Sequence, residues 1–229
     1  MILFKDSIMQ ERNLLSEWSK LLTAEQMEVV KANSVMLNYN KTEMICKQGA
    51  FASNVYFVER GLMKAYKEYK NGNLIMRFVK PGEIVGLSSL YNKGVYLYSV
   101  ASVGASSVMS VTADVVKQLI RENSDFSEMV ISSLNQVTVA EHERVISLTQ
   151  KQLNGRIADA VLHFANNVYN ADEFNLQLTR RDVADFCGMS TESAIRILKE
   201  LHNDKIIRIE GKNLKIISKQ LLLNVSEFG

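Results

Sequence analysis

The side chains best suited to chemistry lie near the C-terminal end of the chain, between about residue 179 and residue 219. Glu192 and Arg196 are four residues apart, which places them on one face of a helix. Arginine matches the O6 and N7 acceptors of guanine, and glutamate can accept a hydrogen bond from the N4 amine of cytosine. From Arg196 to Lys219 there are seven basic residues and three acidic ones, and a local positive excess suits contact with phosphates. This pattern predicts a surface that binds nucleic acid.

Catalytic or metal-binding residues show no comparable grouping. The chain has three histidines, His142, His163 and His202, and two distant cysteines, Cys46 and Cys187. It contains no phosphate-binding loop, dinucleotide-binding glycine series, nucleophile elbow or zinc-protease motif. Two cysteines are too few for a four-cysteine iron–sulfur site, and Cys187 fits a buried core thiol. We therefore expect no enzyme, no cofactor and no metal.

The stretch from Leu178 to Leu201 has the signals of a helix-turn-helix. Thr179 and Asp182 form a capping-box pattern at the start of a helix over 180–187. Gly188 supplies the left-handed corner that a tight turn between helices needs. Ser190 then caps a second helix, the recognition helix. The apolar residues expected to be buried by the two helices are Val183, Ala184, Phe186, Ala194, Ile197, Leu198 and Leu201.

A hairpin is predicted directly after these helices. Apolar and basic residues alternate over 206–209 and 214–217, around a turn at 210–213. A hairpin that follows a recognition helix is a wing. The residues expected to read bases are Thr191, Glu192, Ile195 and Arg196. Those expected to contact phosphates are Thr179, Arg180, Arg181, Ser190, Lys212 and Lys215.

The N-terminal half has the sequence pattern of a β-rich domain. Thr23 and Gln26 form a capping-box pattern for a short helix. From about Val35, short apolar runs alternate with Gly, Asn and Lys, and Asn71-Gly72 between two runs predicts a hairpin turn. Pro81-Gly82 predicts a second turn. Evenly spaced short strands with glycine turns favour a barrel or jelly roll.

A long helix is predicted between the two halves. Residues 114–152 contain no Gly or Pro, and the part over 124–150 would span about 40 Å at 1.5 Å per residue. Its apolar stripe favours pairing with a second copy of the chain, although packing on its own sensor domain is the alternative. Asn154-Gly155 is expected to break the helical pattern. The residues expected to form the dimer contact are Val130, Leu134, Val137, Val145 and Leu148.

Together these patterns predict an α+β protein with an N-terminal barrel or jelly roll, a long helix suited to self-pairing and a C-terminal winged helix-turn-helix. The expected boundaries are 1–113, 114–153 and 154–229. The first thirty residues lack a signal-peptide core, and no apolar run is long enough to span a membrane. We expect a cytoplasmic protein.

The chain resembles the cyclic-AMP receptor protein and fumarate-nitrate regulator (CRP/FNR) family over nearly its whole length. The resemblance implies a β-roll (jelly-roll) sensor domain, a long dimerisation helix and a winged helix-turn-helix. It also implies a dimeric regulator that binds palindromic promoter DNA, and contacts RNA polymerase if it is an activator. Glu192 and Arg196 match the family's base-reading Glu and Arg. The matching segments are 48–49, 55–58, Gly61, 81–86, 155–158, 179–180 and 188–201.

The sensor domain differs from the cyclic-nucleotide-binding members at the residues that hold the nucleotide. In those proteins a Glu holds the ribose and an Arg-Ser pair holds the cyclic phosphate. In this chain Leu87 stands at the position of that Glu, and Tyr96-Leu97 stands at the positions of the Arg-Ser pair. A cyclic phosphate buried there would have no cationic partner in the motif. We expect a small-molecule effector other than cyclic AMP, if there is one. The candidate pocket residues are Leu87, Tyr91, Tyr96, Leu97, Tyr98 and Thr138. The alternative function is a ligand-binding sensor module that acts through protein contacts rather than DNA.

Overall fold

A computed structural model describes residues 18–70 and 72–229 of the chain. These residues form two compact units, one made of residues up to 68 together with 78–140, and one made of 69–77 together with 141–229. The boundary along the chain therefore falls inside the long helix α4 (Ser124–Gln150). Within the described residues, no helix is both long enough and apolar enough to cross a membrane.

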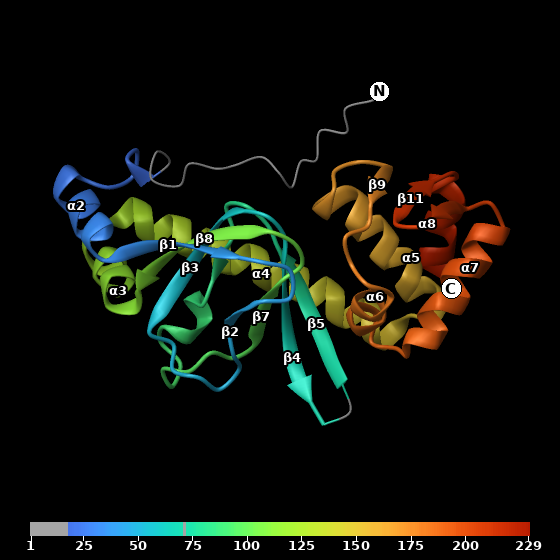
Figure 1. The fold of residues 1–229 in the computed structure, drawn as a ribbon, viewed down its shortest axis with the longest axis horizontal. Coiled ribbons are helices and arrows are strands. Elements are labelled where there is room, and N and C mark those ends of the chain that lie inside the picture. The colour runs from blue at the N-terminus through green and yellow to red at the C-terminus, as the bar shows by residue number, and fades with distance from the viewer. Residues whose placement is uncertain (1–17, 71) are drawn as a thin grey trace. The chain divides into compact units, whose positions relative to one another are not determined.

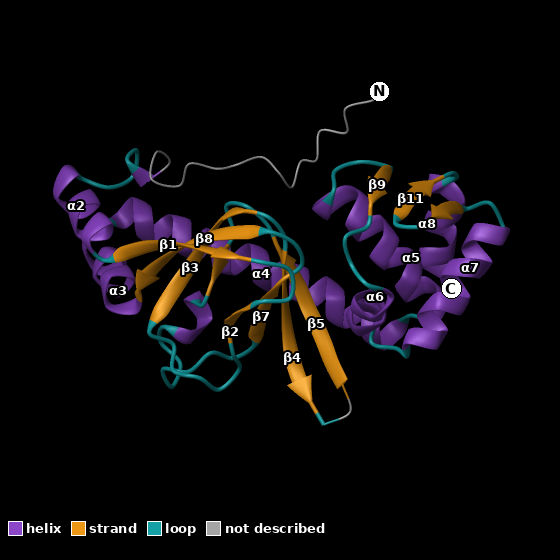
Figure 2. Ribbon diagram, viewed as in Figure 1, coloured by secondary structure: helices purple, strands orange, loops and turns teal. Residues whose placement is uncertain are grey.

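The first unit is built on β-sheets (Figures 1 and 2). Among the described residues, one four-stranded sheet has the order β1-β8-β3-β6 and another has the order β2-β7-β4-β5. Each ladder with a described register is antiparallel, as expected for a jelly roll. The strands of the two sheets are β1 (Ser34–Tyr39), β2 (Met44–Cys46), β3 (Asn54–Arg60), β4 (Met63–Tyr69), β5 (Gly72–Val79), β6 (Ile84–Val85), β7 (Ser99–Ser102) and β8 (Ser106–Thr112). Most of β5 is assigned to the second unit.

One of the two turns predicted from the sequence, Pro81-Gly82, lies between strands as expected. β4 ends at Tyr69 and its neighbour in the sheet, β5, begins at Gly72, whereas Asn71 of the predicted Asn71-Gly72 turn lies outside the described residues. Gly82 has a φ of +87° in the turn before β6, a value that favours glycine. Thr23 and Gln26 form the expected capping box at the start of α2 (Ala24–Ala32), with each backbone N–H donating to the other side chain.

Two aromatic side chains anchor the start of the long helix to the first unit. Phe126 on α4 packs edge-on against Trp18 with ring centroids 5.3 Å apart, and Trp18 packs in the same way against Phe57 on β3 at 4.4 Å. Asn123, after α3 (Ala113–Glu122), accepts a hydrogen bond from the Phe126 amide at 2.8 Å. Val130, one turn further along α4, is buried in the same apolar cluster. This end of α4 therefore belongs to the sensor core.

The second unit is mainly helical (Figure 2). Its elements after α4 are α5 (Leu153–His163), the π-helical turn η3 (Phe164–Val168), β9 (Glu173–Asn175), α6 (Arg180–Cys187), α7 (Thr191–Asn203), β10 (Ile207–Glu210), β11 (Asn213–Ile216) and α8 (Lys219–Phe228). Asn154-Gly155 was predicted to break the helical pattern, and that prediction is wrong: the chain leaves helix at 151–152, and Gly155 lies in the first turn of α5. A Cβ at Gly155 would clash with the carbonyl oxygen of Gly229, so close packing, rather than a turn, requires glycine there.

Candidate nucleic-acid interface

Helix α7 presents one polar face to solvent and buries the other. Ser190 caps it, because its Oγ accepts a hydrogen bond from the Ser193 amide at 3.1 Å. Ala194, Ile197, Leu198 and Leu201 are buried, as predicted. Of the four predicted base-reading residues, Glu192, Ile195 and Arg196 are exposed and Thr191 is half-buried. All four lie in the first two turns of the helix, on its accessible side.

The turn before α7 has the geometry that the sequence predicted. Gly188 ends α6 with a φ of +60°, and a Cβ there would lie 3.1 Å from Cδ2 of Leu148. The backbone conformation therefore favours glycine, and a larger residue would also have to displace the Leu148 side chain by a few tenths of an ångström. At the other end of α6, the Thr179 hydroxyl accepts from the Asp182 amide at 3.0 Å and donates to the Asp182 carboxylate at 2.7 Å. That hydroxyl is occupied by the cap, which leaves little capacity for the phosphate contact predicted for Thr179.

The predicted wing is present and has a third strand. β10 and β11 pair with Ile207 opposite Ile216 and Glu210 opposite Asn213. Gly211, with a φ of +62°, and exposed Lys212 form the turn. β9 pairs with the other edge of β11. The sequence analysis did not find β9, because three residues with one buried side chain, Phe174, give too short an alternation to recognise.

Several of the cations on this surface are paired with acidic side chains of the same chain. The shortest pairs join Arg196 to Glu200 at 2.7 Å and Lys215 to Glu173 at 2.6 Å. Exposed pairs of this kind contribute about 0–1 kcal/mol at most, so DNA phosphates and bases can displace the carboxylates. Other pairs on this surface are Arg181–Asp185 at 3.8 Å, Arg208–Glu210 at 4.0 Å and Lys219–Asp172 at 3.3 Å.

Comparison with known proteins matches both parts of the chain. A cyclic nucleotide-binding domain model matches residues 36–123, and a Crp-like helix-turn-helix domain model matches residues 155–225. The two matches cover the β-roll and the winged helix-turn-helix described above, in the same order. The chain belongs to the CRP/FNR family of transcription regulators.

Named proteins from several bacteria are similar to this chain. The cAMP-activated global transcriptional regulator CRP of Salmonella typhimurium is 24% identical over 183 residues, which cover 78% of this chain and 87% of CRP. FixK2 of Bradyrhizobium japonicum has a similar solved structure, with a TM-score of 0.76, 22% identity, and coverage of 84% of this chain and 96% of FixK2. The c-di-GMP responsive regulator CLP of Xanthomonas campestris gives a TM-score of 0.71 at 19% identity, covering 85% and 99%. The CRP/FNR fold and DNA-binding regulation predicted from the sequence are thus confirmed.

The candidate effector pocket of this CRP/FNR chain is not one cluster of side chains. Tyr96 is buried among the apolar residues between the sheets, with Tyr98 packed against the same cluster. Leu87 is buried in a different cluster, which contains Trp18 and Phe126. Tyr91 is 70% exposed, and the exposed Thr138 donates its hydroxyl to the Leu134 carbonyl within α4. Leu97 is half-buried. The structure brings together only Tyr96 and Tyr98.

Tyr96 is held in place inside the roll. Its phenol donates a 2.7 Å hydrogen bond to the Asn54 carbonyl, and its hydroxyl oxygen lies 3.5 Å from that of Tyr56. Burial, together with the neighbouring Tyr56, raises the pKa of Tyr96 well above its ordinary value. A Cβ at Gly86, whose φ is +95°, would lie 3.3 Å from the Tyr96 ring. At one of the positions where the resemblance places the phosphate clamp, this chain therefore has a buried neutral phenol.

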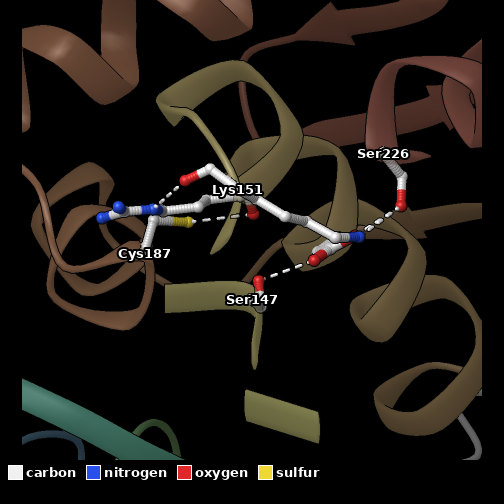
Figure 3. Close-up of polar contacts among 6 residues, drawn as sticks. Ser147, Lys151, Cys187 and Ser226 are labelled. Atoms are coloured by element: carbon white, nitrogen blue, oxygen red, sulfur yellow. Dashed lines mark hydrogen bonds and ion pairs between the residues drawn. The ribbon is translucent and has the colours of Figure 1, made fainter. Parts of the chain in front are cut away.

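A polar cluster within the second unit links α4, α5 and α8 (Figure 3). The Asp159 carboxylate accepts from Ser147 at 2.6 Å, Lys151 at 2.7 Å and Ser226 at 2.5 Å. Next to it, Arg156 Nε donates to the Lys151 carbonyl at 2.9 Å. The sequence analysis did not identify this cluster, because Asp159 and Ser226 are 67 residues apart and Ser147, Lys151 and Ser226 belong to no recognised motif. It fixes the packing of the helices that support the interface.

The core below the interface contains a buried cation. The Arg144 guanidinium carbon lies 3.8 Å from the centre of the Phe186 ring on α6, a cation–π arrangement. Burial lowers the pKa of Arg144 to about 10, which still leaves it charged at neutral pH. Cys187, the next residue on α6, is fully buried and its thiol donates to the Arg156 carbonyl. It is a core thiol, as the sequence predicted.

Proposed function

We propose that this regulator acts as a homodimer on a palindromic promoter site, and that cyclic AMP does not control it. The dimer is supported by one observation above all, the exposed apolar face of α4. Ile131, Leu134, Val139, Val145 and Ile146 are between 38% and 66% exposed, which is unusual for so many large aliphatic side chains on one helix. A second copy of α4 would cover them.

The exposed face differs in part from the stripe predicted from the sequence. Of the five predicted residues, Leu134 and Val145 are exposed, whereas Val130 is buried in the sensor core and Val137 and Leu148 are half-buried. Ile131, Leu134, Thr138 and Val145 recur at intervals of three, four and seven residues, the spacing of a coiled-coil seam. We therefore propose that Ile131 takes the role expected of Val130.

The effector assignment rests on the chemistry of the roll. A cyclic phosphate needs a cation or several amide donors when it is buried, and this chain presents Tyr96 and Leu97 where the resemblance places that clamp. Leu87 cannot accept a hydrogen bond from a ribose hydroxyl. The named relatives show that family members differ in effector, since CRP is described as cAMP-activated and CLP as c-di-GMP responsive. We propose that any effector of this chain is a small molecule other than cyclic AMP, and that the protein is not an enzyme.

Sedimentation and site selection test the proposal together. Analytical ultracentrifugation at micromolar concentration should give a dimer, and selection from randomised DNA should return an inverted repeat. Twofold symmetry places the half-sites about one helical turn, or a multiple of it, apart. A monomer that binds a single half-site with full affinity would contradict the proposed dimer. If the protein is an activator, RNA polymerase is a further partner in the cytoplasm.

A further inference from the structure

The last turn of the recognition helix is hydrogen-bonded to the wing. Nδ1 of His202, near the end of α7, lies 3.1 Å from the backbone nitrogen of Ile209 on β10. A backbone amide can only donate, so Nδ1 is the acceptor and a neutral imidazole carries its proton on Nε2. This contact joins the helix that enters the major groove to the hairpin that follows it.

The position of β10 explains why this amide is available. The three strands have the order β10-β11-β9, so β10 is an edge strand among the residues that the structure describes. Alternate amides of an edge strand point away from the sheet and need another acceptor or water. The amide of Ile209 points away from β11, because it donates to His202 rather than across the pair. His202 therefore accepts a hydrogen bond from an edge-strand amide and holds β10 in place relative to α7.

A second contact holds the tip of the same hairpin. Nη2 of Arg180, the first residue of α6, lies 3.3 Å from the carbonyl oxygen of Gly211 in the wing turn. The Arg180 residue is half-buried, and this burial lowers the pKa of its guanidinium. Arg180 was predicted from the sequence as a phosphate contact, and the structure places its guanidinium against the wing.

We propose that His202 and Arg180 are positioning residues that hold the wing, residues 207–216, at its edge and at its tip. Together they fix the distance between Lys212 in the turn and the base-reading face of α7. Recognition helix and wing then meet the duplex as one rigid surface, and Lys212 reaches its phosphate without a loss of freedom on binding. The inference goes beyond the DNA-binding function and concerns how that function is achieved.

The test uses two substitutions of His202 in the full-length protein. His202→Leu removes the acceptor, whereas His202→Asn retains an amide oxygen close to the place of Nδ1. We expect His202→Leu to weaken operator binding about fivefold, the scale of one hydrogen bond. The slope of affinity against salt should fall by about one, as for loss of one phosphate contact. His202→Asn should restore both, and neither variant should change the selected base sequence.

A double-mutant cycle with Lys212 separates positioning from general damage to the fold. If His202 acts through the wing, Lys212→Ala should cost much less in the His202→Leu background than in the wild type. The same cycle with Arg180→Met should show the same coupling. Additive effects of Lys212→Ala and His202→Leu would overturn the inference, as would an unchanged salt slope in His202→Leu. Failure of the wild type to bind any inverted repeat would instead contradict the proposed function, and thermal melting of each variant detects misfolding.

Discussion

Nη1 of Arg196 lies 2.7 Å from Oε1 of Glu200, one turn further along the recognition helix. The guanidinium that we expect to read a guanine is therefore held by a carboxylate of its own helix when DNA is absent. The two side chains are 59% and 44% exposed, so the pair is weak enough for a base to replace it. We therefore expect Glu200 to compete with DNA for Arg196.

This relationship predicts that Glu200→Gln tightens binding. The amide keeps the shape of the side chain and removes the charge that Arg196 must leave, which should raise operator affinity by up to about fivefold, the limit set by an exposed ion pair. Fluorescence anisotropy with a labelled operator measures the change. Asp204→Asn is the matched control, because it removes one negative charge beyond the same helix. Equal gains for both variants would show a general charge effect instead of a specific pair.

Two other substitutions should distinguish a base-reading residue from a phosphate-binding residue. Arg196→Ala should cost about 1–3 kcal/mol on the selected operator and relax the preference at one base pair, because a bidentate contact to guanine is lost. Lys212→Ala should weaken all sequences alike and reduce the salt slope by about one. Binding-site selection with each variant decides between these roles. An unchanged base preference in Arg196→Ala would remove this residue from the reading face.

The dimer prediction concerns the exposed face of α4. Leu134→Asp together with Val145→Asp should give monomers that lose binding to the full inverted repeat, since two buried carboxylates in a helix pair are costly. Gln136→Asp is the control, because Gln136 is also exposed but lies about 140° around the helix from Ile131 at 3.6 residues per turn. Sedimentation velocity measures the outcome. A double variant that remains a dimer would place the interface elsewhere.

Calorimetry tests the effector proposal. Cyclic AMP added to the protein at micromolar concentration should give no heat of binding and no change in operator affinity, because a buried phenol stands at one of the clamp positions. Tyr96→Arg with Leu97→Ser restores the side chains that the resemblance places there, and it serves as the comparison. Tight binding of cyclic AMP to the wild type, coupled to tighter operator binding, would overturn the assignment.

Sequence patterns predicted the local features well and the faces of α4 poorly. The capping boxes at Thr23 and Thr179 and the left-handed Gly188 are set by neighbouring residues, so their signals are complete in the sequence. Val130 and Leu134 look equivalent as aliphatic residues on a helix, yet one is buried and the other exposed. The difference arises from Trp18 and Phe57, whose rings pack with Phe126 on one side of α4. Periodicity contains no information about such distant partners.

The acidic partners of the cations on the candidate interface could not be predicted from the sequence either, for a physical reason. Glu173 is 42 residues from Lys215 in sequence, and β9 brings the two together by pairing with β11. Composition records only a positive excess over 196–219. The pairs show that part of this charge is compensated within the folded domain, which a count of charges along the chain cannot reveal.

Another prediction concerns the two thiols. Burial raises the pKa of both Cys46 and Cys187 to about 12 from 9.0, and the reactive form of a cysteine is the thiolate. Iodoacetamide at pH 8 should therefore leave both residues unmodified in the folded protein and alkylate both after unfolding in guanidinium. Intact mass spectrometry gives the number of alkylated cysteines. Modification of the folded protein at pH 8 would contradict the burial of these side chains.

The same shift makes a prediction for stability at high pH. The folded-state pKa of Cys187 is raised, so its contribution is fully present below the unfolded value near 9 and is lost as the pH rises toward 12. Above pH 9 the unfolded chain releases this proton and the folded chain keeps it, which lowers the free energy of unfolding by up to about 1.4 kcal/mol per pH unit. Guanidinium denaturation at pH 8, 9 and 10 should show a shallower decline for Cys187→Ala than for the wild type. At pH 8 the difference in the free energy of unfolding between Cys187→Ala and the wild type measures the packing of the side chain alone. Equal slopes of the free energy of unfolding against pH for the two proteins would show that Cys187 ionises in the folded state.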